Sequence, residues 1–218
     1  ILAPQPFMID KFKSFVSLYK ESNSLESVKN LQELKNLEEV RSIFSALENQ
    51  DKNNKLMFVG GCVRKLLNKE SVNDIDIATN LTPVELKNIL TKKNMYFIET
   101  GIAHGTITVV INEIKFEITT LRKDVSTDGR HANVEFISDW ETDAKRRDFT
   151  INAIYSDLKG EIYDPLDGLT DLKNGIVKFI GDPNERIKED YLRILRYFRF
   201  YTQYSKHKHD IVTIQSIK

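Results

Sequence analysis

The chain has 218 residues, of which 40% are hydrophobic and 29% are charged, a composition typical of a globular protein with a buried core. Its formal net charge is zero, which argues against a protein that binds polyanions through overall charge alone. No apolar run reaches the length of a membrane span and no signal peptide is evident, so we expect no membrane partner. The single cysteine, Cys62, cannot form an internal disulfide, and we therefore expect a reducing, cytoplasmic environment.

Hydrophobic periodicity predicts the elements of the first half of the chain. Residues 7–47 place apolar side chains at near-helical spacing, which predicts helix. Lys55–Val59 predicts a short strand that runs into Gly60 and Gly61 and is followed by a helix. Asn73–Ala78 predicts a second strand, and Thr82–Pro83 is a helix-start signal with a threonine cap.

The second half predicts a hairpin and then a more irregular segment. Gly105–Ile111 and Ile114–Leu121 alternate clearly and predict two strands of one hairpin. Residues 122–140 are polar without a sustained period, which predicts a long loop. We further expect a helix over 147–155, a strand over 176–180 and a helix that begins at Asp182–Pro183. The pattern favours a mixed α/β (α+β) head that ends near Gly181 and is followed by a helical segment.

Two carboxylates alternate along the second predicted strand. Asp74 and Asp76 share one face of a strand, whereas Ile75 and Ile77 point into a core. Neighbouring carboxylates repel each other unless a cation lies between them, and oxygen ligands suit Mg²⁺. The Asp-x-Asp pattern alone is weak, because it arises more often from two solvated strand carboxylates than from a metal site.

A glycine pair precedes these carboxylates. Gly60 and Gly61 lie between a predicted strand and a helix, where backbone N–H groups can approach a phosphate. Arg64 falls in the first turn of that helix and could contact a triphosphate. Taken alone, the pair is better explained as a tight strand-to-helix turn.

Further charged residues follow in the order of the chain. Glu117 lies on the polar side of a predicted strand and can complete a three-carboxylate site if that strand neighbours the Asp74 strand. Arg146 and Arg147 beside Asp148 can clamp a phosphate, whereas Asn152 would lie on the opposite side of a helix. The pattern Glu189-Asp190-x-x-Arg193-x-x-Arg196-x-x-Arg199 has helical near-neighbour spacing, which an ordinary surface ion pair would also have.

This ordered set of motifs resembles the bacterial-type (class II) tRNA CCA-adding enzymes and poly(A) polymerases. The resemblance covers roughly Leu37–Phe200. The motifs that carry it are Gly60–Arg64, Asp74–Asp76, Phe116–Arg122, Asp128–His131, Arg146–Ala153 and Glu189–Arg199. It implies a nucleotidyltransferase head with a small mixed β-sheet flanked by helices, followed by the start of a helical neck.

The resemblance also implies residue roles. Asp74 and Asp76 would bind two Mg²⁺ ions, with Glu117 as the third carboxylate. Nucleotide binding would fall to Gly60, Gly61, Arg64 and Arg147, with Asp190 and Arg193 reading the base edge and Arg196 and Arg199 supporting the site. The 122–140 segment matches the one that flexes in this family as specificity changes from C to A.

The resemblance implies addition of CMP and AMP from CTP and ATP to the 3′ end of tRNA. We expect a helical extension over 1–36, a catalytic head over 37–180 and the start of a neck over 181–218. Family members usually continue into a helical body that holds the tRNA, so we expect either that the chain is truncated or that a second chain supplies that part. Poly(A) or A-only addition, and an inactive RNA-binding fragment, remain open alternatives.

Overall fold

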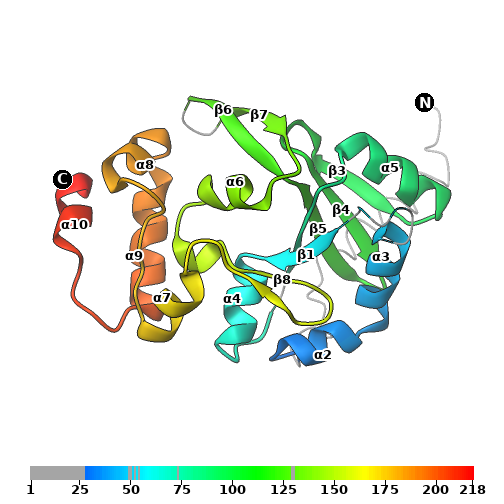
Figure 1. The fold of residues 1–218 in the computed structure, drawn as a ribbon, viewed down its shortest axis with the longest axis horizontal. Coiled ribbons are helices and arrows are strands. Elements are labelled where there is room, and N and C mark those ends of the chain that lie inside the picture. Colours follow the sequence, from blue (N-terminus) through cyan, green and yellow to red (C-terminus); the bar gives the residue numbers. More distant parts are fainter. Residues whose placement is uncertain (1–27, 49–50, 52, 54, 73, 129–130) are drawn as a thin grey trace, which may run out of the picture.

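The computed structural model describes residues 28–48, 51, 53, 55–72, 74–128 and 131–218. A seven-stranded mixed sheet of order β3-β4-β5-β2-β1-β8-β9 forms the centre, and β6 and β7 form a separate two-stranded sheet (Figure 1). The strands are β1 (Leu56–Val59), β2 (Ile75–Thr79), β3 (Phe97–Gly101), β4 (Thr106–Ile111), β5 (Ile114–Thr120), β6 (Arg122–Asp128), β7 (His131–Phe136), β8 (Tyr155–Ser156) and β9 (Ile162–Tyr163). The expected mixed α/β class is confirmed.

Helices surround this sheet. They are α2 (Leu31–Asn36), α3 (Glu38–Glu48), α4 (Gly61–Leu67), α5 (Pro83–Lys92), α6 (Trp140–Lys145), α7 (Gly168–Asn174), α8 (Pro183–Glu189), α9 (Leu192–Tyr204) and α10 (Ile211–Ile217). Single 3₁₀ turns lie at Ile102–His104 and Thr150–Asn152. Within the described ranges, no helix is long and apolar enough to cross a membrane.

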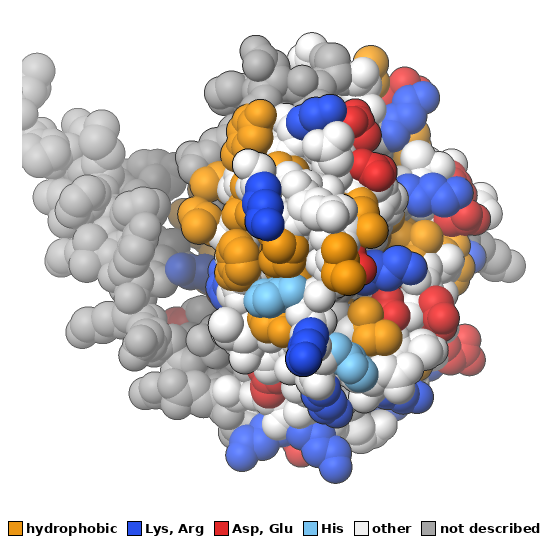
Figure 2. Space-filling model, turned by 90° about the vertical axis from the view of Figure 1, so that its left-hand side faces the viewer, with side chains coloured by type: hydrophobic (Ala, Val, Ile, Leu, Met, Phe, Trp, Pro, Cys, Tyr) orange, Lys and Arg blue, Asp and Glu red, His pale blue; other side chains and the backbone are white. Residues whose placement is uncertain are grey.

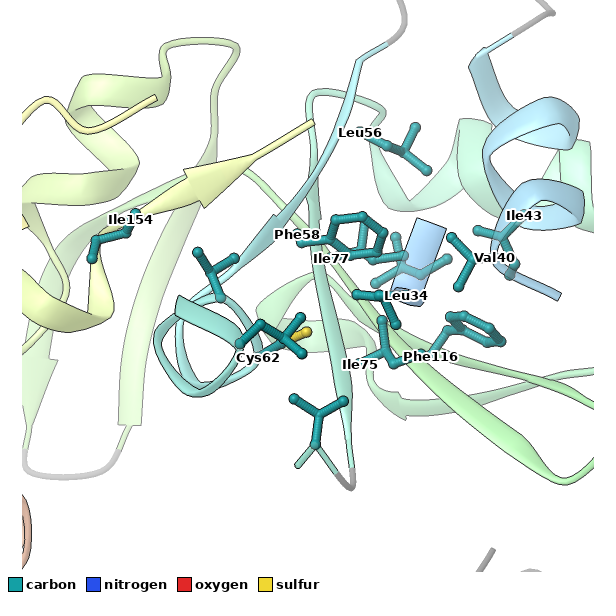
Figure 3. Close-up of a cluster of buried hydrophobic side chains, with 14 of the residues drawn as sticks. Leu34, Val40, Ile43, Leu56, Phe58, Cys62, Ile75, Ile77, Phe116 and Ile154 are labelled. Carbon is teal, nitrogen blue, oxygen red and sulfur yellow. The ribbon is translucent and has the colours of Figure 1, made fainter. Parts of the chain in front are cut away.

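Alternation along the central strand decides which face is buried. Ile75 and Ile77 of β2 are fully buried and pack with Phe116 of β5, Leu34 of α2 and Val40 of α3 (Figure 3). The side chains between them point to the opposite face of the sheet. The main core cluster therefore lies on the side of α2 and α3, and the other face carries Asp76 together with a smaller buried cluster that includes Ala78.

Cap signals place two helices where the sequence predicts them. The Thr82 hydroxyl accepts a hydrogen bond from the Glu85 amide, and the Glu85 carboxylate accepts one from the Thr82 amide, so α5 begins with a complete capping box. Asp182 caps α8 in the same position relative to its helix, with Pro183 in the first turn. The predicted strands at 55–59 and 73–78 and the predicted hairpin are also present, although Asn73 lies outside the described residues.

The prediction of a loop over 122–140 was wrong. β6 and β7 pair from Arg122↔Phe136 to Asp128↔His131, and α6 begins at Trp140. Both strands are mostly polar, so they lack the apolar alternation that marks a strand packed on a core. Backbone pairing rather than burial holds this hairpin together.

The predicted helix over 147–155 and strand over 176–180 were also wrong. The Phe149 amide donates to the Asp148 carboxylate, and the Thr150 amide donates to the Lys178 carbonyl. Neither amide is therefore available for a hydrogen bond within a helix. The residues instead form a 3₁₀ turn and β8, and the expected strand is reduced to a single bridge between Phe149 and Phe179.

The C-terminal segment consists of separate helices. The expected helix from Asp182 breaks at Asp190, whose backbone is extended at φ −157°. Helix α9 follows, and its Tyr197 and Phe200 rings pack on Phe149 and Phe179 of the head. The head and α9 therefore share one core. Of the predicted helix over 7–47, residues 7–27 lie outside the described part, and α2 and α3 form the rest.

Candidate active site

Adjacent parallel strands bring two of the expected carboxylates together. Asp76 on β2 and Glu117 on β5 are direct register partners on the face of the sheet opposite the core. Asp74 lies exposed, directly before β2. Burial, followed by the neighbouring Glu117 charge, raises the pKa of Asp76 to about 6. A cation at this position would relieve that repulsion.

The carboxylates suit a hard divalent cation that keeps other ligands. Mg²⁺ is usually held by one or two carboxylates, with waters and substrate phosphates completing its shell. In the part of the chain that is described, no group of three or more His, Cys, Asp or Glu side chains gathers closely enough to hold a metal ion. Asp74 and Asp76 can supply two oxygen ligands, and the charge of Glu117 contributes to the raised pKa of Asp76.

The glycine pair forms a turn that only glycine fits easily. Gly60 has φ +68°, a conformation that side chains disfavour, and a Cβ there would lie 3.6 Å from Nη1 of Arg147. A Cβ on Gly61 would lie 3.8 Å from Oδ2 of Asp76 and 3.8 Å from Nη2 of Arg64. The turn thus brings the backbone close to a carboxylate and two guanidinium groups.

Arg64 lies deeper than the sequence suggests. Its side chain is only 5% exposed, and its guanidinium lies 4.6 Å from the ring centre of Phe200 and 5.0 Å from that of Tyr204. It also donates a hydrogen bond to the side-chain amide oxygen Oδ1 of Asn152. Arg64 therefore connects the glycine turn to α9, and it also lines a cavity beside that turn.

A cavity of about 620 Å³ joins these features. Its wall contains all eight expected nucleotide-binding residues and Asp76, whereas Asp74 and Glu117 do not line it. Seven arginines and three aspartates contribute, namely Arg64, Arg122, Arg146, Arg147, Arg193, Arg196, Arg199, Asp76, Asp148 and Asp190. This excess of cations over anions favours a polyanionic ligand such as a triphosphate.

The expected base-reading residues lie on the same wall but are held separately. Asp190 accepts a hydrogen bond from the Leu192 amide at 3.0 Å. Arg193 donates to the Glu189 carboxylate at 2.5 Å and to the Arg186 carbonyl at 2.9 Å. Among the described residues no ion pair joins Asp190 to Arg193, so both can act on a ligand independently.

Sequence reasoning missed several buried partners of the arginines. Asp143 is 1% exposed and forms ion pairs with Arg146 and Arg147. Asp148 binds Arg196 of α9 and also accepts a hydrogen bond from Asn152. The expectation that Asn152 lies away from the site was wrong, because the segment is not a helix. Asp143 lies three and four residues before the arginines, and this spacing was the available signal.

Comparison with known proteins identifies the fold family. The sequence profile of the poly A polymerase head domain matches residues 56–178. The chain belongs to this family. The match includes the glycine turn, the carboxylates of β2 and β5 and the arginines after α6, while α8 and α9 lie beyond it.

Similar family members are CCA-adding enzymes by name. Human mitochondrial CCA tRNA nucleotidyltransferase 1 is 48% identical over 169 residues, which cover 76% of this chain and 39% of that protein. The CCA-adding enzyme of Lactobacillus helveticus is 44% identical over 156 residues, or 71% of this chain and 38% of that protein. The chain thus spans about two fifths of the length of these relatives.

Solved structures of the family agree with the fold. The Bacillus stearothermophilus CCA-adding enzyme in complex with CTP has a TM-score of 0.70 at 34% identity, and covers 81% of this chain and 41% of that one. A tRNA nucleotidyltransferase complexed with a primer tRNA and an incoming ATP analogue has a TM-score of 0.62 at 26% identity, with coverage of 79% and 48%.

Proposed function

We propose that this chain adds CMP and AMP, taken from CTP and ATP, to the 3′ end of tRNA. The observation that carries the proposal is the single cavity in which Asp76, the Gly60–Gly61 turn and the Asp190–Arg193 segment meet. The wall of that cavity contains a carboxylate, several arginines and the proposed base-reading groups. Relatives named as CCA-adding enzymes, one solved with CTP and another with tRNA and an ATP analogue, support the assignment.

The chain's residues have distinct tasks in this reaction. Asp74 and Asp76 would hold Mg²⁺, which supplies charge neutralisation and activation of the attacking 3′-hydroxyl when bound. The Gly60–Gly61 turn lets the backbone approach the triphosphate closely. Arg147, with its cationic neighbours, stabilises the negative charge that passes to the leaving pyrophosphate.

Base selection follows from hydrogen-bond complementarity. Cytosine and adenine both present an amino donor beside a ring-nitrogen acceptor. Asp190 can accept from the amino group and Arg193 can donate to the ring nitrogen, and both side chains line the cavity. Uracil and guanine place a carbonyl where Asp190 needs a donor, which leaves a charged group unpaired.

An addition assay tests the proposal. The purified chain is incubated with Mg²⁺, a tRNA that ends before CCA, and each labelled nucleotide in turn. We expect C and A to be incorporated and U and G to be excluded, and we expect chelation of Mg²⁺ to stop incorporation. Incorporation of A alone would support poly(A) or A-only addition instead, and tRNA binding without any incorporation would support an RNA-binding fragment.

A carboxylate variant tests the role of Asp76. Asp76→Ala should lower incorporation by at least about 10³-fold, because a metal ligand contributes several kcal/mol to the transition state. Removing this carboxylate also relieves repulsion, so the variant should fold. Glu161→Ala, an exposed carboxylate beside β9, serves as the matched control and should retain full activity. Equal activity of the two variants would contradict the assignment.

We further propose that another polypeptide segment covers the face formed by α9 and α10 and completes the RNA-holding surface. Figure 2 shows apolar side chains grouped on this side of the molecule. Leu195 is 68% exposed and Ile211 72% exposed, which is unusual for large aliphatic side chains. Binding of a second chain would bury these exposed side chains. Sedimentation with and without tRNA would detect the resulting complex.

We retain a cytoplasmic location as a proposal, with mitochondria as the alternative because one relative is named mitochondrial. Imaging of the tagged native protein would distinguish these compartments.

A further inference from the structure

A buried carboxylate lies behind the arginines of the candidate active site. The Asp143 side chain is 1% exposed, and both of its carboxylate oxygens accept hydrogen bonds. Oδ2 accepts from Nη2 of Arg147 at 3.0 Å, from Nε of Arg147 at 3.3 Å and from the Tyr155 hydroxyl at 2.8 Å. Oδ1 accepts from Nε of Arg146 at 2.9 Å and from the Arg122 amide at 3.2 Å. Such a fully used carboxylate holds its partners in one geometry.

The contacts of Arg147 leave one end of its guanidinium for a ligand. Nε and Nη2 of Arg147 donate to Asp143, and Nε also donates to the Tyr155 hydroxyl at 3.1 Å. The remaining Nη1 faces the glycine turn, since a Cβ built on Gly60 would lie 3.6 Å from it. Asp143 therefore fixes the side of Arg147 that points away from the turn.

The position of Asp143 in α6 argues against a purely structural role. The helix is capped by Asp139, which accepts from the Thr142 amide at 2.9 Å. Asp143 lies one turn further on, where a buried carboxylate would be unfavourable without its arginines. Arg146 and Arg147 both line the cavity, whereas Asp143 does not.

We propose that Asp143 is a positioning residue, which holds Arg146 and Arg147 at the cavity wall so that they engage the phosphates of the incoming nucleotide. This inference rests on the proposed function for the identity of the ligand. A guanidinium already held in place loses little rotamer freedom when the nucleotide binds, so the triphosphate is bound more tightly. The contribution is specific to phosphate and does not extend to the base.

The test compares CTP with CMP, which share a base and a ribose but differ in phosphate content. Calorimetry gives the ratio of the two dissociation constants for the wild type and for Asp143→Asn. The asparagine keeps the shape of the side chain but loses the charge, and its amide would face a guanidinium. We expect the preference for CTP over CMP to fall about tenfold or more, with CMP binding nearly unchanged.

Two further variants separate positioning from stability. Asp139→Ala removes the cap of α6 without touching either arginine, so it should lower the melting temperature and leave the CTP preference intact. Asp143→Glu keeps the charge but displaces it by one methylene, and it should give an intermediate preference. If Asp143→Asn does not fold, the glutamate variant decides alone.

The outcomes are distinct. The inference is overturned if the Asp143 variants keep the wild-type preference, if Asp139→Ala lowers it equally, or if the wild type does not prefer CTP at all. Transfer to tRNA is measured separately. A wild type that prefers CTP but never transfers it would overturn the proposed function and leave the positioning role standing.

Discussion

Gly168 and Gly160 lack a side chain for two different physical reasons. Gly168 begins α7, and a Cβ there would lie 2.1 Å from the Thr150 carbonyl oxygen, which is impossible without backbone movement. Gly160 has φ +90°, but nothing lies within 4 Å of its virtual Cβ. A side chain at Gly168 would overlap the Thr150 carbonyl, whereas a side chain at Gly160 would only strain the backbone conformation.

This contrast predicts unequal losses of stability. Gly168→Ala should lower the free energy of unfolding by about 3 kcal/mol or more, because the turn after Asp148 must shift. Gly160→Ala should cost about 1 kcal/mol, the usual strain of a left-handed residue. Urea denaturation of both variants measures the difference. Similar losses would show that the Thr150 carbonyl moves freely.

Asp143 predicts a dependence of stability on acid. Burial alone would raise the pKa of Asp143, but Arg147 and Arg146 hold it at about 2, below the ordinary value of 3.8. A depressed carboxyl pKa stabilises the fold above the unfolded value, and that stabilisation is lost as the pH falls through 4 toward 2. The advantage of the wild type over Asp143→Asn should therefore shrink by about 1 kcal/mol between pH 6 and pH 3. A difference that does not change with pH would contradict the ion-pair assignment.

Residues differed in how far sequence alone could place them. Asp76 and the Gly60 turn were predictable, because strand alternation and a glycine pair are local signals. The burial of Arg64 was not, since its contacts with Phe200 and Tyr204 come from residues more than a hundred positions away. Asp143 was partly predictable, because its spacing to the arginines is visible in the sequence whereas its burial depends on tertiary packing.

Among the elements, α9 connects the core to the cavity. Phe200 is 3% exposed, and the guanidinium groups of Arg64 and Arg199 lie 4.6 Å and 4.7 Å from its ring centre. The same helix presents Leu195 at 68% exposure on its other side. One helix therefore carries both a buried aromatic ring and an exposed aliphatic side chain.

Truncation of these two side chains should have very different effects. Phe200→Ala should lower the free energy of unfolding by about 3–5 kcal/mol, through lost burial and the cavity left behind. It should also weaken CTP binding, because Arg64 and Arg199 lose the ring between them. Leu195→Ala should change stability by less than about 0.5 kcal/mol. Thermal denaturation with and without CTP tests both, and an equal loss would mean that α9 does not pack as described.

Elements held by burial could be predicted, whereas those held by polar pairing could not. β2 and β5 carry apolar residues in alternation, which is why their strands were expected. β6 and β7 consist mostly of polar residues, so their sequence carries no such pattern. The turn after α6 depends on an amide that bonds to the Lys178 carbonyl, a contact that no local pattern encodes.

At the scale of the whole molecule, the head and α9 form one packed unit. Tyr197, Phe200 and Tyr204 belong to the same core cluster as Phe149 and Phe179. The division into residues 1–36, 37–180 and 181–218 stays a proposal about roles. It separates the phosphate-binding part from the base-reading part, although the two pack together.

A shared core predicts cooperative unfolding. Calorimetry of the chain should give a single transition whose van't Hoff and calorimetric enthalpies agree. Separate transitions for the head and the C-terminal helices would show that the boundary near Gly181 also divides folding units. Phe200→Ala serves as the comparison, since weakening the shared core should lower the one transition rather than split it.

The two oxygens of Asp143 have an evolutionary consequence. Oδ1 pairs with Arg146 and Oδ2 with Arg147, so loss of either arginine would leave a buried carboxylate oxygen with fewer hydrogen-bond donors. Loss of the aspartate in turn leaves two half-buried cations without this counter-charge. Drift at any one of the three positions is therefore penalised by the other two, and homologous chains should retain or replace the three residues as a set.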